Sequence, residues 1–492
     1  MTTLSNTNLA ELDSSRVARP EYDRSRVRPG IAHFGVGNFH RTHEAVYVDR
    51  CLHLPGNEGW GIVGIGISDS ESARQKAEKF RRQDCLYTVT EFSPNGGRHS
   101  RVIGAMVSYL HAPSEPEAVL TQLSDPDLRI VSMTITEGGY NIDEVSREFV
   151  VDNPLIQADL RGGAPATVFG FIVQALARRR AAGVPPFTVV SCDNLRQSGA
   201  TAKKAVLGFA RALDPEMAGW IDANVAFPNS MVDRIAPSVT ADDRFRLNSS
   251  TGVDDLVPAM SESYIQWVIE DRFPTGRPDL HKVGVELRDD VELFEAMKGR
   301  LLNASHVLMS YPSVLLGHRL VDEGMADPRI QALLHTFTQV DSIPLVTGPA
   351  GVSLEDYRDL VLNRFSNPSV GDQLLRVASD GAAKIPVFHS RTLAELLERG
   401  CDIRREAFLL ACYDRYLEGI DETGASFEVS EPSLSDSDRE SIRSEDGLGL
   451  LRIPAFASLN LEAHSAFVSA YQELRASIAA DGVGATLDRL NG

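Results

Sequence analysis

Four polar residues of different chemistry lie close together in an otherwise apolar stretch: Glu295, Lys298, Asn303 and His306. Each residue of an α-helix advances about 100°, so with Lys298 at zero the other three fall at about 60°, 140° and 80° in chain order. They are therefore predicted to share one helical face. A lysine on such a face can accept a proton when burial or nearby dipoles lower its pKa toward neutrality.

Oxidation of an alcohol requires this chemistry, because a hydroxyl proton must leave as hydride departs from the adjacent carbon. Zinc can assist that step, but the sequence has no CxxC, HxxxH or HExxH spacing, so we expect no metal. Asn303, His306 and Asn194 are candidate donors to the developing alkoxide. The alternatives are ordinary ones: a single lysine is usually solvated, and Asn194 could be a turn residue after Asp193.

A glycine-containing turn near the N-terminus is typical of a dinucleotide site. A predicted strand at 31–34 leads into Gly35-Val36-Gly37, then Asn38, Phe39 and a helical run at 43–52. The first glycine permits a tight turn, and the second lets the backbone approach a pyrophosphate at a helix N-terminus. His40 stands in place of the usual third glycine, so a plain strand-to-helix turn is the alternative.

Two carboxylates follow the next predicted strand, at 61–67. They lie in Ser68-Asp69-Ser70-Glu71. Asp69 or Glu71 could bind the ribose diol and repel a 2′-phosphate, which favours NAD over NADP. Alternatively, either residue could simply cap the helix that follows.

The pattern of elements predicts an α/β protein of two domains. Strands at 128–135 and 187–191 and a helix at 167–180 continue the βαβ alternation of a parallel sheet. From about residue 290 the periodicity becomes helical, and 428–447 is expected to be a solvated loop. We expect a Rossmann-like NAD-binding domain over residues 1–285 and a mainly α-helical substrate and catalytic domain over 286–492. The helices expected in the second domain are 293–320, 327–339, 354–364, 392–399, 405–417 and 463–480.

Bulk properties narrow the class of protein. A chain of 492 residues is too long for one hydrophobic core, and a formal net charge of −19 argues against nucleic-acid or anionic-membrane partners. No run of apolar residues is long enough to span a membrane, and no signal peptide is visible. The five cysteines are scattered and odd in number, which predicts reduced thiols and a cytoplasmic location.

Several motifs together resemble the polyol-specific long-chain dehydrogenases over nearly the whole chain. The resemblance implies a metal-independent, NAD-dependent enzyme, commonly monomeric, with Rossmann-like and helical domains. It implies that Lys298 is the general base, that Asn194 and Asn303 form an oxyanion hole, that His306 orients the reacting oxygen and that Glu295 exchanges protons with solvent. It further implies that Asp233, Arg376 and Lys384 bind sugar hydroxyls. The motifs are 35–41, 134–140, 191–194, 231–235 and Lys298-x4-Asn303-x2-His306.

The expected reaction is reversible oxidation of a small polyol, D-mannitol at C2 to D-fructose. D-Arabinitol and D-sorbitol are alternative substrates. A fructuronate or tagaturonate reductase also remains open, because a carboxylate favours a bidentate arginine and Arg376 is available. A non-catalytic sugar-binding protein would be expected to have lost Lys298 or the two asparagines, and all three are present.

Overall fold

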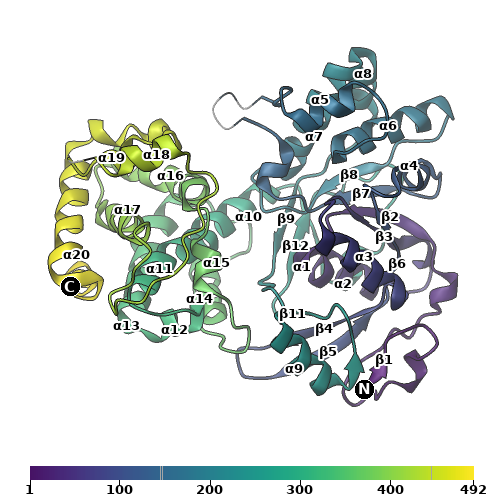
Figure 1. The fold of residues 1–492 in the computed structure, drawn as a ribbon, viewed down its shortest axis with the longest axis horizontal. Helices are drawn as coiled ribbons and strands as arrows, with labels where there is room; N and C mark the ends of the chain where they lie inside the picture. Colours follow the sequence, from purple (N-terminus) through teal and green to yellow (C-terminus); the bar gives the residue numbers. More distant parts are fainter. Residues whose placement is uncertain (144–145, 147, 445) are drawn as a thin grey trace. The chain divides into compact units, whose positions relative to one another are not determined.

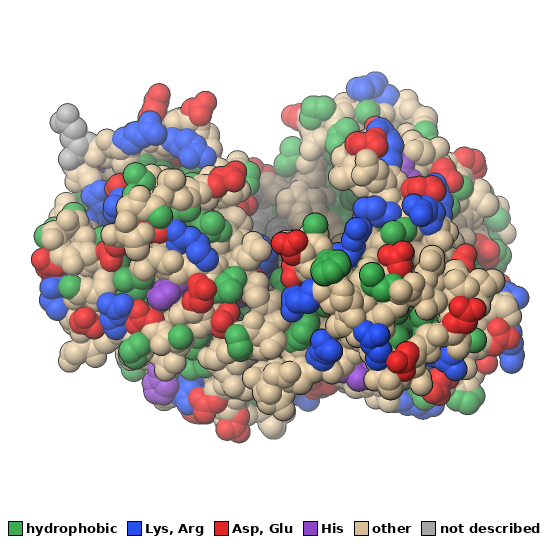
Figure 2. Space-filling model, turned by 60° about the horizontal axis from the view of Figure 1, so that its bottom comes forward, with side chains coloured by type: hydrophobic (Ala, Val, Ile, Leu, Met, Phe, Trp, Pro, Cys, Tyr) green, Lys and Arg blue, Asp and Glu red, His purple; other side chains and the backbone are tan. Residues whose placement is uncertain are grey.

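The computed structural model describes residues 1–143, 146, 148–444 and 446–492 (Figure 1). The chain forms two compact units, one of residues 1–93 and 97–292 and the other of 94–96 and 293–492. The boundary between the units falls between Glu292 and Leu293, a few residues beyond the expected position 285, because β13 (Glu286–Leu287) pairs with β12 (Gln266–Ile269) of the first unit. On the face drawn in Figure 2, acidic and basic side chains are interspersed.

The first unit is built on a five-stranded parallel sheet, which confirms the predicted fold class. Side chains alternate between the two faces of a strand. Ala32 and Phe34 therefore join one core with α4, α6 and α7, while Ile31 joins the other core with α2 and α3. In spatial order the strands are β6 (Met106–His111), β3 (Gly61–Gly66), β2 (Pro29–Phe34), β7 (Ile130–Met133) and β8 (Thr188–Ser191).

Three smaller sheets and further helices complete this unit. The sheets are β11 (Ala259–Glu262), β4 (Tyr87–Phe92) and β5 (Arg98–Ile103); β13 (Glu286–Leu287), β12 (Gln266–Ile269) and β9 (Ser230–Asp233); and β1 (Thr2–Thr3) with β10 (Val253–Asp254). The helices are α1 (Asn38–Thr42), α2 (Glu44–Leu52), α3 (Glu71–Arg82), α4 (Pro116–Ser124), α5 (Pro154–Leu160), α6 (Val168–Ala181), α7 (Ser198–Leu213), α8 (Pro215–Asn224) and α9 (Ala241–Thr251).

The second unit is helical, as predicted. Two of its segments, η6 (Lys298–Asn303) and η7 (Phe337–Ser342), are π-helices. The α-helices are α10 (Val291–Met297), α11 (Ala304–Leu315), α12 (Val321–Ala326), α13 (Pro328–Thr336), α14 (Leu354–Phe365), α15 (Leu374–Ala378), α16 (Gly381–Arg399), α17 (Arg404–Tyr416), α18 (Asp436–Ile442), α19 (Gly449–Arg452) and α20 (Ser465–Asn491). None of the helices in the described ranges is both long and apolar enough to cross a membrane.

Several predicted boundaries in this unit are wrong. The helix expected at 293–320 is α10, η6 and α11 in succession. The loop expected at 428–447 contains α18, which begins at a capping box between Ser435 and Asp438. The helix expected at 392–399 is only the end of α16, which continues through Pro386. A proline lacks the N–H of a helix interior, so Pro386 is an unfavourable residue within α16.

Candidate active site

The turn after β2 has the geometry of a dinucleotide cradle. Gly35 has φ +92°, and a Cβ there would lie 1.9 Å from the carbonyl oxygen of Thr134. Gly37 donates its N–H to the carbonyl of Gly35 (2.7 Å) and is the N-cap of α1. The turn therefore lies at the carboxyl ends of β2 and β7, where open α/β sheets bind their ligands.

Asn38 and Phe39, which were also predicted to bind cofactor, brace this turn with their side chains. The amide of Asn38 donates to the carbonyl of Pro237 (3.2 Å) and accepts from Arg41 (2.6 Å). Phe39 stacks on His43, with ring centroids 4.7 Å apart. The backbone at these two positions remains the part that can approach a cofactor.

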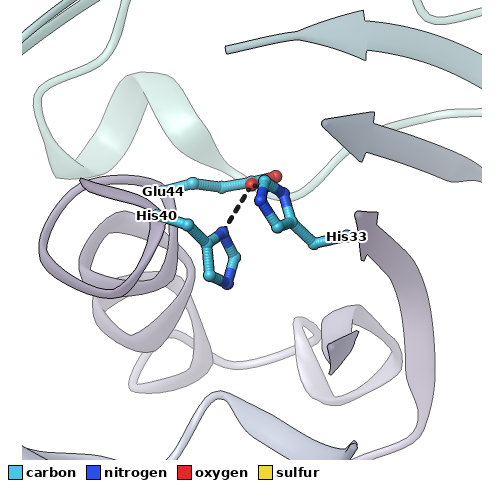
Figure 3. A group of neighbouring side chains, drawn as sticks. All are labelled: His33, His40 and Glu44. Atoms are coloured by element: carbon cyan, nitrogen blue, oxygen red, sulfur yellow. Dashed lines mark hydrogen bonds and ion pairs between the residues drawn. The ribbon is translucent and has the colours of Figure 1, made fainter. Parts of the chain in front are cut away.

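His40, in place of the third glycine, belongs to a buried polar cluster with His33, Glu44 and Ser132 beneath the turn. Figure 3 shows the Glu44 carboxylate reaching toward both imidazoles, which come from β2 and α1. Glu44 Oε2 lies 2.7 Å from His33 Nδ1 and 3.1 Å from His40 Nδ1, and Ser132 donates to it (3.0 Å). On its other side, His33 Nε2 is 3.3 Å from the carbonyl oxygen of Gly35. The cluster therefore ties the glycine turn to the sheet.

The electrostatics of the cluster favour a neutral His40 and an ionised Glu44. Burial, followed by the charge of His33, lowers the pKa of His40 to about 3. Burial alone would raise the pKa of Glu44, but its contacts with His33 and His40 hold that pKa well below its usual range. Glu44 is therefore a buried carboxylate stabilised by imidazole partners.

The three ligand-type atoms of His33, His40 and Glu44 lie within 4.8 Å of one another, a spacing that could suggest a metal site. The ring geometry does not suit one. The imidazoles are stacked 3.5 Å apart with an interplanar angle of 19°. A metal ion lies close to the plane of each imidazole that binds it, and two nearly parallel planes at this separation cannot both contain one ion.

The two carboxylates at the end of β3 share one partner, Arg74. Ser70 caps α3, accepting from the N–H of Ala73 (3.3 Å), so the alternative that Asp69 or Glu71 caps this helix is wrong. Asp69 pairs with Arg74 at 2.7 Å, and Glu71, in the first turn of α3, pairs with it at 3.6 Å and accepts from Gln75 (3.1 Å).

A lysine that the sequence analysis did not single out reaches the glycine turn from α3. The ammonium of Lys76 donates to the carbonyl of Val36. Burial, and then the charge of Arg41, lowers the pKa of Lys76 to about 7. An amine that is partly protonated near pH 7 is thus placed beside the loop predicted to receive a pyrophosphate.

Asn194 is exposed and directly follows a residue with a firm structural role. Asp193 accepts from the backbone N–H groups of Ile135 (3.0 Å) and Thr136 (2.9 Å) and from the hydroxyl of Tyr140 (2.7 Å). These bonds hold Thr136 at φ +65°, a strained conformation for a residue with a side chain. The ends of β7 and β8 are thereby fixed together next to Asn194.

Asp233, the last residue of β9, is buried at 3% exposure. Its neighbour Arg234 makes a buried ion pair with Glu91 (2.6 Å) and donates to the carbonyl of Glu262 (2.9 Å). The 231–235 motif therefore combines a structural arginine with a carboxylate placed at a strand end.

Lys298 and Asn303 are the first and last residues of a π-helix, so the α-helical wheel is wrong for this pair. The N–H of Ala304 bonds the carbonyl of Gly299, five residues earlier. A π-turn is wider than an α-turn, with hydrogen bonds between residues i and i+5, and π-turns inside α-helices frequently mark functional sites. Lys298 and Asn303 therefore lie closer in angle than on an α-helix. Lys298 is buried, with 8% exposure, and Glu295 lies three residues earlier in α10.

Arg300 anchors the π-turn from within. Its guanidinium donates to Thr392 Oγ1 (3.0 Å), to the carbonyl of Leu345 (2.9 Å) and to Glu395 (3.3 Å). The hydroxyl of Ser342, the last residue of the other π-helix, donates to the carbonyl of Arg300 (3.2 Å). Tertiary contacts thus support the unusual helical register.

His306 lies on α11 against Phe365, with stacked rings 4.5 Å apart. Its Nε2 is 3.5 Å from Asp372 Oδ2. Burial, opposed by Asp372 and assisted by Arg376 and Lys384, lowers the pKa of His306 to about 4. The imidazole is therefore neutral near pH 7, as a donor to a reacting oxygen should be.

Arg376 and Lys384, which are predicted to bind substrate, lie near enough to His306 for their charges to lower its pKa. Asp372 accepts three hydrogen bonds from Nε and Nη2 of Arg376 (2.6–3.0 Å). Lys384 donates to the carbonyl oxygens of Val377 (3.1 Å) and Arg376 (3.3 Å) at the end of α15.

The predicted site residues thus fall into two sets. The second unit contains Glu295, Lys298, Asn303, His306, Arg376 and Lys384, and the first unit contains Asn194, Asp233 and the cofactor loop. Sequence reasoning missed the supporting residues, although two i, i+4 pairs, His40 with Glu44 and Asp372 with Arg376, were visible signals. The residues missed are His33, Glu44, Arg74, Lys76, Arg300, Ser342 and Asp372.

Comparison with known proteins matches both parts of the chain. The sequence model described as the mannitol dehydrogenase Rossmann domain matches residues 29–282, and that of the mannitol dehydrogenase C-terminal domain matches 290–477. The chain belongs to the mannitol dehydrogenase family. This assignment confirms the resemblance predicted from the motifs.

Three members of this family illustrate the range of names among its relatives. A polyol:NADP oxidoreductase of Gluconobacter oxydans (strain 621H) is 48% identical over 90% of this chain and 91% of its own. A D-sorbitol dehydrogenase structure in substrate-free form is 45% identical, with a TM-score of 0.88 over 99% and 100% of the chains. The Pseudomonas fluorescens mannitol 2-dehydrogenase ternary complex with NAD and D-mannitol is 39% identical, with a TM-score of 0.93 over 99% of each chain.

Proposed function

We propose that this protein is an NAD-dependent polyol dehydrogenase that oxidises D-mannitol at C2 to D-fructose, reversibly and without a metal. The observation that carries the proposal is the buried amine of Lys298 at the start of a π-turn that ends at Asn303, with neutral His306 in the following helix. Burial disfavours the charged form of an amine, which suits Lys298 to accept a proton.

In the proposed mechanism, Lys298 takes the proton of the C2 hydroxyl. Asn303 and Asn194 donate to the oxygen as negative charge develops on it, and His306 orients that oxygen. Glu295 passes the proton to solvent, while Asp233, Arg376 and Lys384 bind the remaining hydroxyls. When bound, NAD supplies the hydride acceptor. Residues 1–285 would thus bind the cofactor and contribute Asn194 and Asp233 to the substrate, while residues 286–492 would supply the other substrate-binding groups and the proton chemistry.

The residues at the end of β2 suit a dinucleotide. A side chain at Gly35 would meet the backbone of Thr134, so this tight turn requires glycine, and Gly37 is the N-cap of α1, whose N-terminus favours an anion. For the ribose we favour Asp69 over Glu71, because Asp69 precedes the capping residue of α3 and Glu71 lies within the helix. Its carboxylate supports a preference for NAD over NADP.

The state of the cysteines supports a cytoplasmic location for the proposed enzyme. The cysteines are all free thiols, four of them buried, which suits a reducing cytoplasm. We also propose that the enzyme acts as a monomer on small-molecule polyol and ketose substrates.

The function is tested by steady-state kinetics on D-mannitol, D-sorbitol, D-arabinitol and D-mannonate, each with NAD and with NADP. We expect D-mannitol with NAD to give the highest kcat/KM. Lys298→Met should lower kcat on D-mannitol by about 10²–10⁴, the usual contribution of a general base. Lys282→Met, which removes an exposed lysine paired with Asp279, is the matched control and should leave kcat unchanged.

Two results would contradict this proposal. Turnover of Lys298→Met close to that of the native enzyme would remove the assigned base. A preference for D-mannonate, or for another polyol, would replace the substrate while leaving the family intact.

A further inference from the structure

We propose that Asp372 sets the substrate class of this enzyme: by binding the fork of Arg376, it makes the site select neutral polyols and keto-sugars over sugar acids. The proposal rests on the proposed function and addresses the point that the sequence leaves open. An available Arg376 would suit a carboxylate substrate, whereas an occupied one would not.

The geometry shows which donors of Arg376 are occupied. Asp372 Oδ1 accepts from Nε (3.0 Å) and Nη2 (2.6 Å), and Oδ2 accepts from Nη2 (2.8 Å). This is the side-on fork through which arginine binds a carboxylate with two parallel hydrogen bonds. A substrate carboxylate would have to displace Asp372 to use it.

The position of Asp372 is fixed by its surroundings. Asp372 is 4% exposed, whereas the side chain of Arg376 is 47% exposed. The carbonyl of Asp372 accepts from the N–H of Val321 (2.9 Å), and the next residue, Gln373, forms a bridge with Leu320. The carboxylate of Asp372 is therefore the buried member of the pair, and the side chain of Arg376 is the solvent-exposed member.

The negative charge of Asp372 also disfavours a substrate carboxylate. A substrate carboxylate beside Arg376 would also approach the Asp372 carboxylate, and like charges within a few ångströms disfavour the ionised forms. The Nη1 donors lie outside the fork that Asp372 takes, and an arginine has five donors in total. Hydrogen bonds from such donors to a hydroxyl oxygen need no net positive charge.

The second predicted substrate cation is also engaged by the protein. Lys384 donates to the carbonyl oxygens of Arg376 and Val377 and contacts Ser379 Oγ (3.4 Å) at the end of α15. A cation at a helix C-terminus is stabilised by the backbone dipoles. Asp372 also faces His306 at 3.5 Å, so it lies next to the group assigned to the reacting oxygen.

The test compares the reduction of two ketoses by NADH, D-fructuronate and D-fructose. They differ at C6, which is a carboxylate in D-fructuronate and a hydroxymethyl group in D-fructose. We expect Asp372→Asn to raise the ratio of kcat/KM for the acid to that for the neutral ketose by at least about 10-fold, because the fork of Arg376 is released from an ionic partner. Asp372→Glu keeps the charge and should keep the native ratio within about two-fold.

Asp327→Asn is the matched control, because Asp327 binds Arg329 through the same two-bonded geometry elsewhere in the second unit. It should lower stability without changing the ratio. A measurement on the native enzyme does not depend on the folding of any variant: D-mannonate should inhibit D-mannitol oxidation with an inhibition constant at least about 10-fold above the KM of D-mannitol.

The outcomes separate this inference from the function on which it rests. The inference alone is overturned if Asp372→Asn leaves the ratio of kcat/KM for the acid to that for the neutral ketose unchanged. It is also overturned alone if D-mannonate inhibits the native enzyme tightly. A native enzyme that reduces neither ketose overturns the proposed function and the inference with it.

Discussion

The glycine turn of the first unit and the Lys298 segment of the second position their functional groups in different ways. At the turn, the shape of the site depends on the backbone. Gly35 is confined by the carbonyl of Thr134, and the His33–Glu44 pair fixes the turn from beneath. In the Lys298 segment, side chains carry the proposed chemistry, and a π-turn anchored by Arg300 sets their angles. The first site should therefore be sensitive to added atoms, and the second to small changes in helical register.

The largest expected effect is that of an added methyl group at the turn. Gly35→Ala forces a side chain at φ +92° into the backbone of Thr134, 1.9 Å away, so the loop must move. We expect the NAD dissociation constant, measured by fluorescence titration, to rise more than about 100-fold, beyond the strain of a left-handed residue alone.

Gly56→Ala is the control for backbone strain. Gly56 has φ +84°, and a Cβ there would meet no atom within 4 Å. This variant should lose stability but bind NAD normally. Equal NAD affinity in Gly35→Ala and the native protein would show that confinement of the turn is not what shapes the cofactor site.

Both units should lose stability in acid, because each contains buried histidines whose pKa values are lowered. Burial lowers the pKa of His40 to about 3 and of His43 to about 4 in the first unit, and of His306 to about 4 in the second. An unfolded histidine titrates near about 6.5, so between these values the unfolded chain binds more protons. The stability contributed by these neutral histidines is complete above about pH 6.5 and is lost as the pH falls.

Removing one of these buried histidines should reduce the unfolding free energy that the protein loses as the pH falls. Between pH 7.5 and 5.5, His40→Gln should lose about 1.4 kcal/mol less unfolding free energy than the native protein, as measured by denaturant titration. His281→Gln, at an exposed histidine, should follow the native curve. Parallel curves for His40→Gln and the native protein would mean that His40 does not titrate as its burial requires.

The parts of the fold that sequence could predict are those fixed by local periodicity. The strands β2, β3 and β8 and the helices α6, α14 and α17 lie within a few residues of the expected ranges, because apolar spacing and caps such as Thr167 are local signals. The start of α16 is different, since Glu431, fifty residues away in sequence, accepts from the N–H groups of Gly381 and Ala382.

The candidate site divides in the same way. Lys298, Asn303 and His306 could be singled out by residue type, but their angles could not be predicted, because the π register depends on Thr392, Leu345 and other distant partners. His33 and Glu44 come together through the pairing of β2 with its neighbours and the packing of α2, which no short motif encodes.

The smallest expected effect tests whether the π register matters for turnover. Ser342→Ala removes the hydroxyl that donates to the carbonyl of Arg300 within the π-turn (3.2 Å). Ser310→Ala is matched to it, because that buried hydroxyl donates to the carbonyl of Val307 (2.8 Å) within regular α11. Each variant should lose about 0.5–1.5 kcal/mol of unfolding free energy. Only Ser342→Ala should also lower kcat on D-mannitol, by a few-fold, because of these two bonds only the one from Ser342 supports the turn between Lys298 and Asn303. If both variants lowered kcat equally, the loss would follow from general destabilisation, and the π-turn would be a structural irregularity without a catalytic consequence.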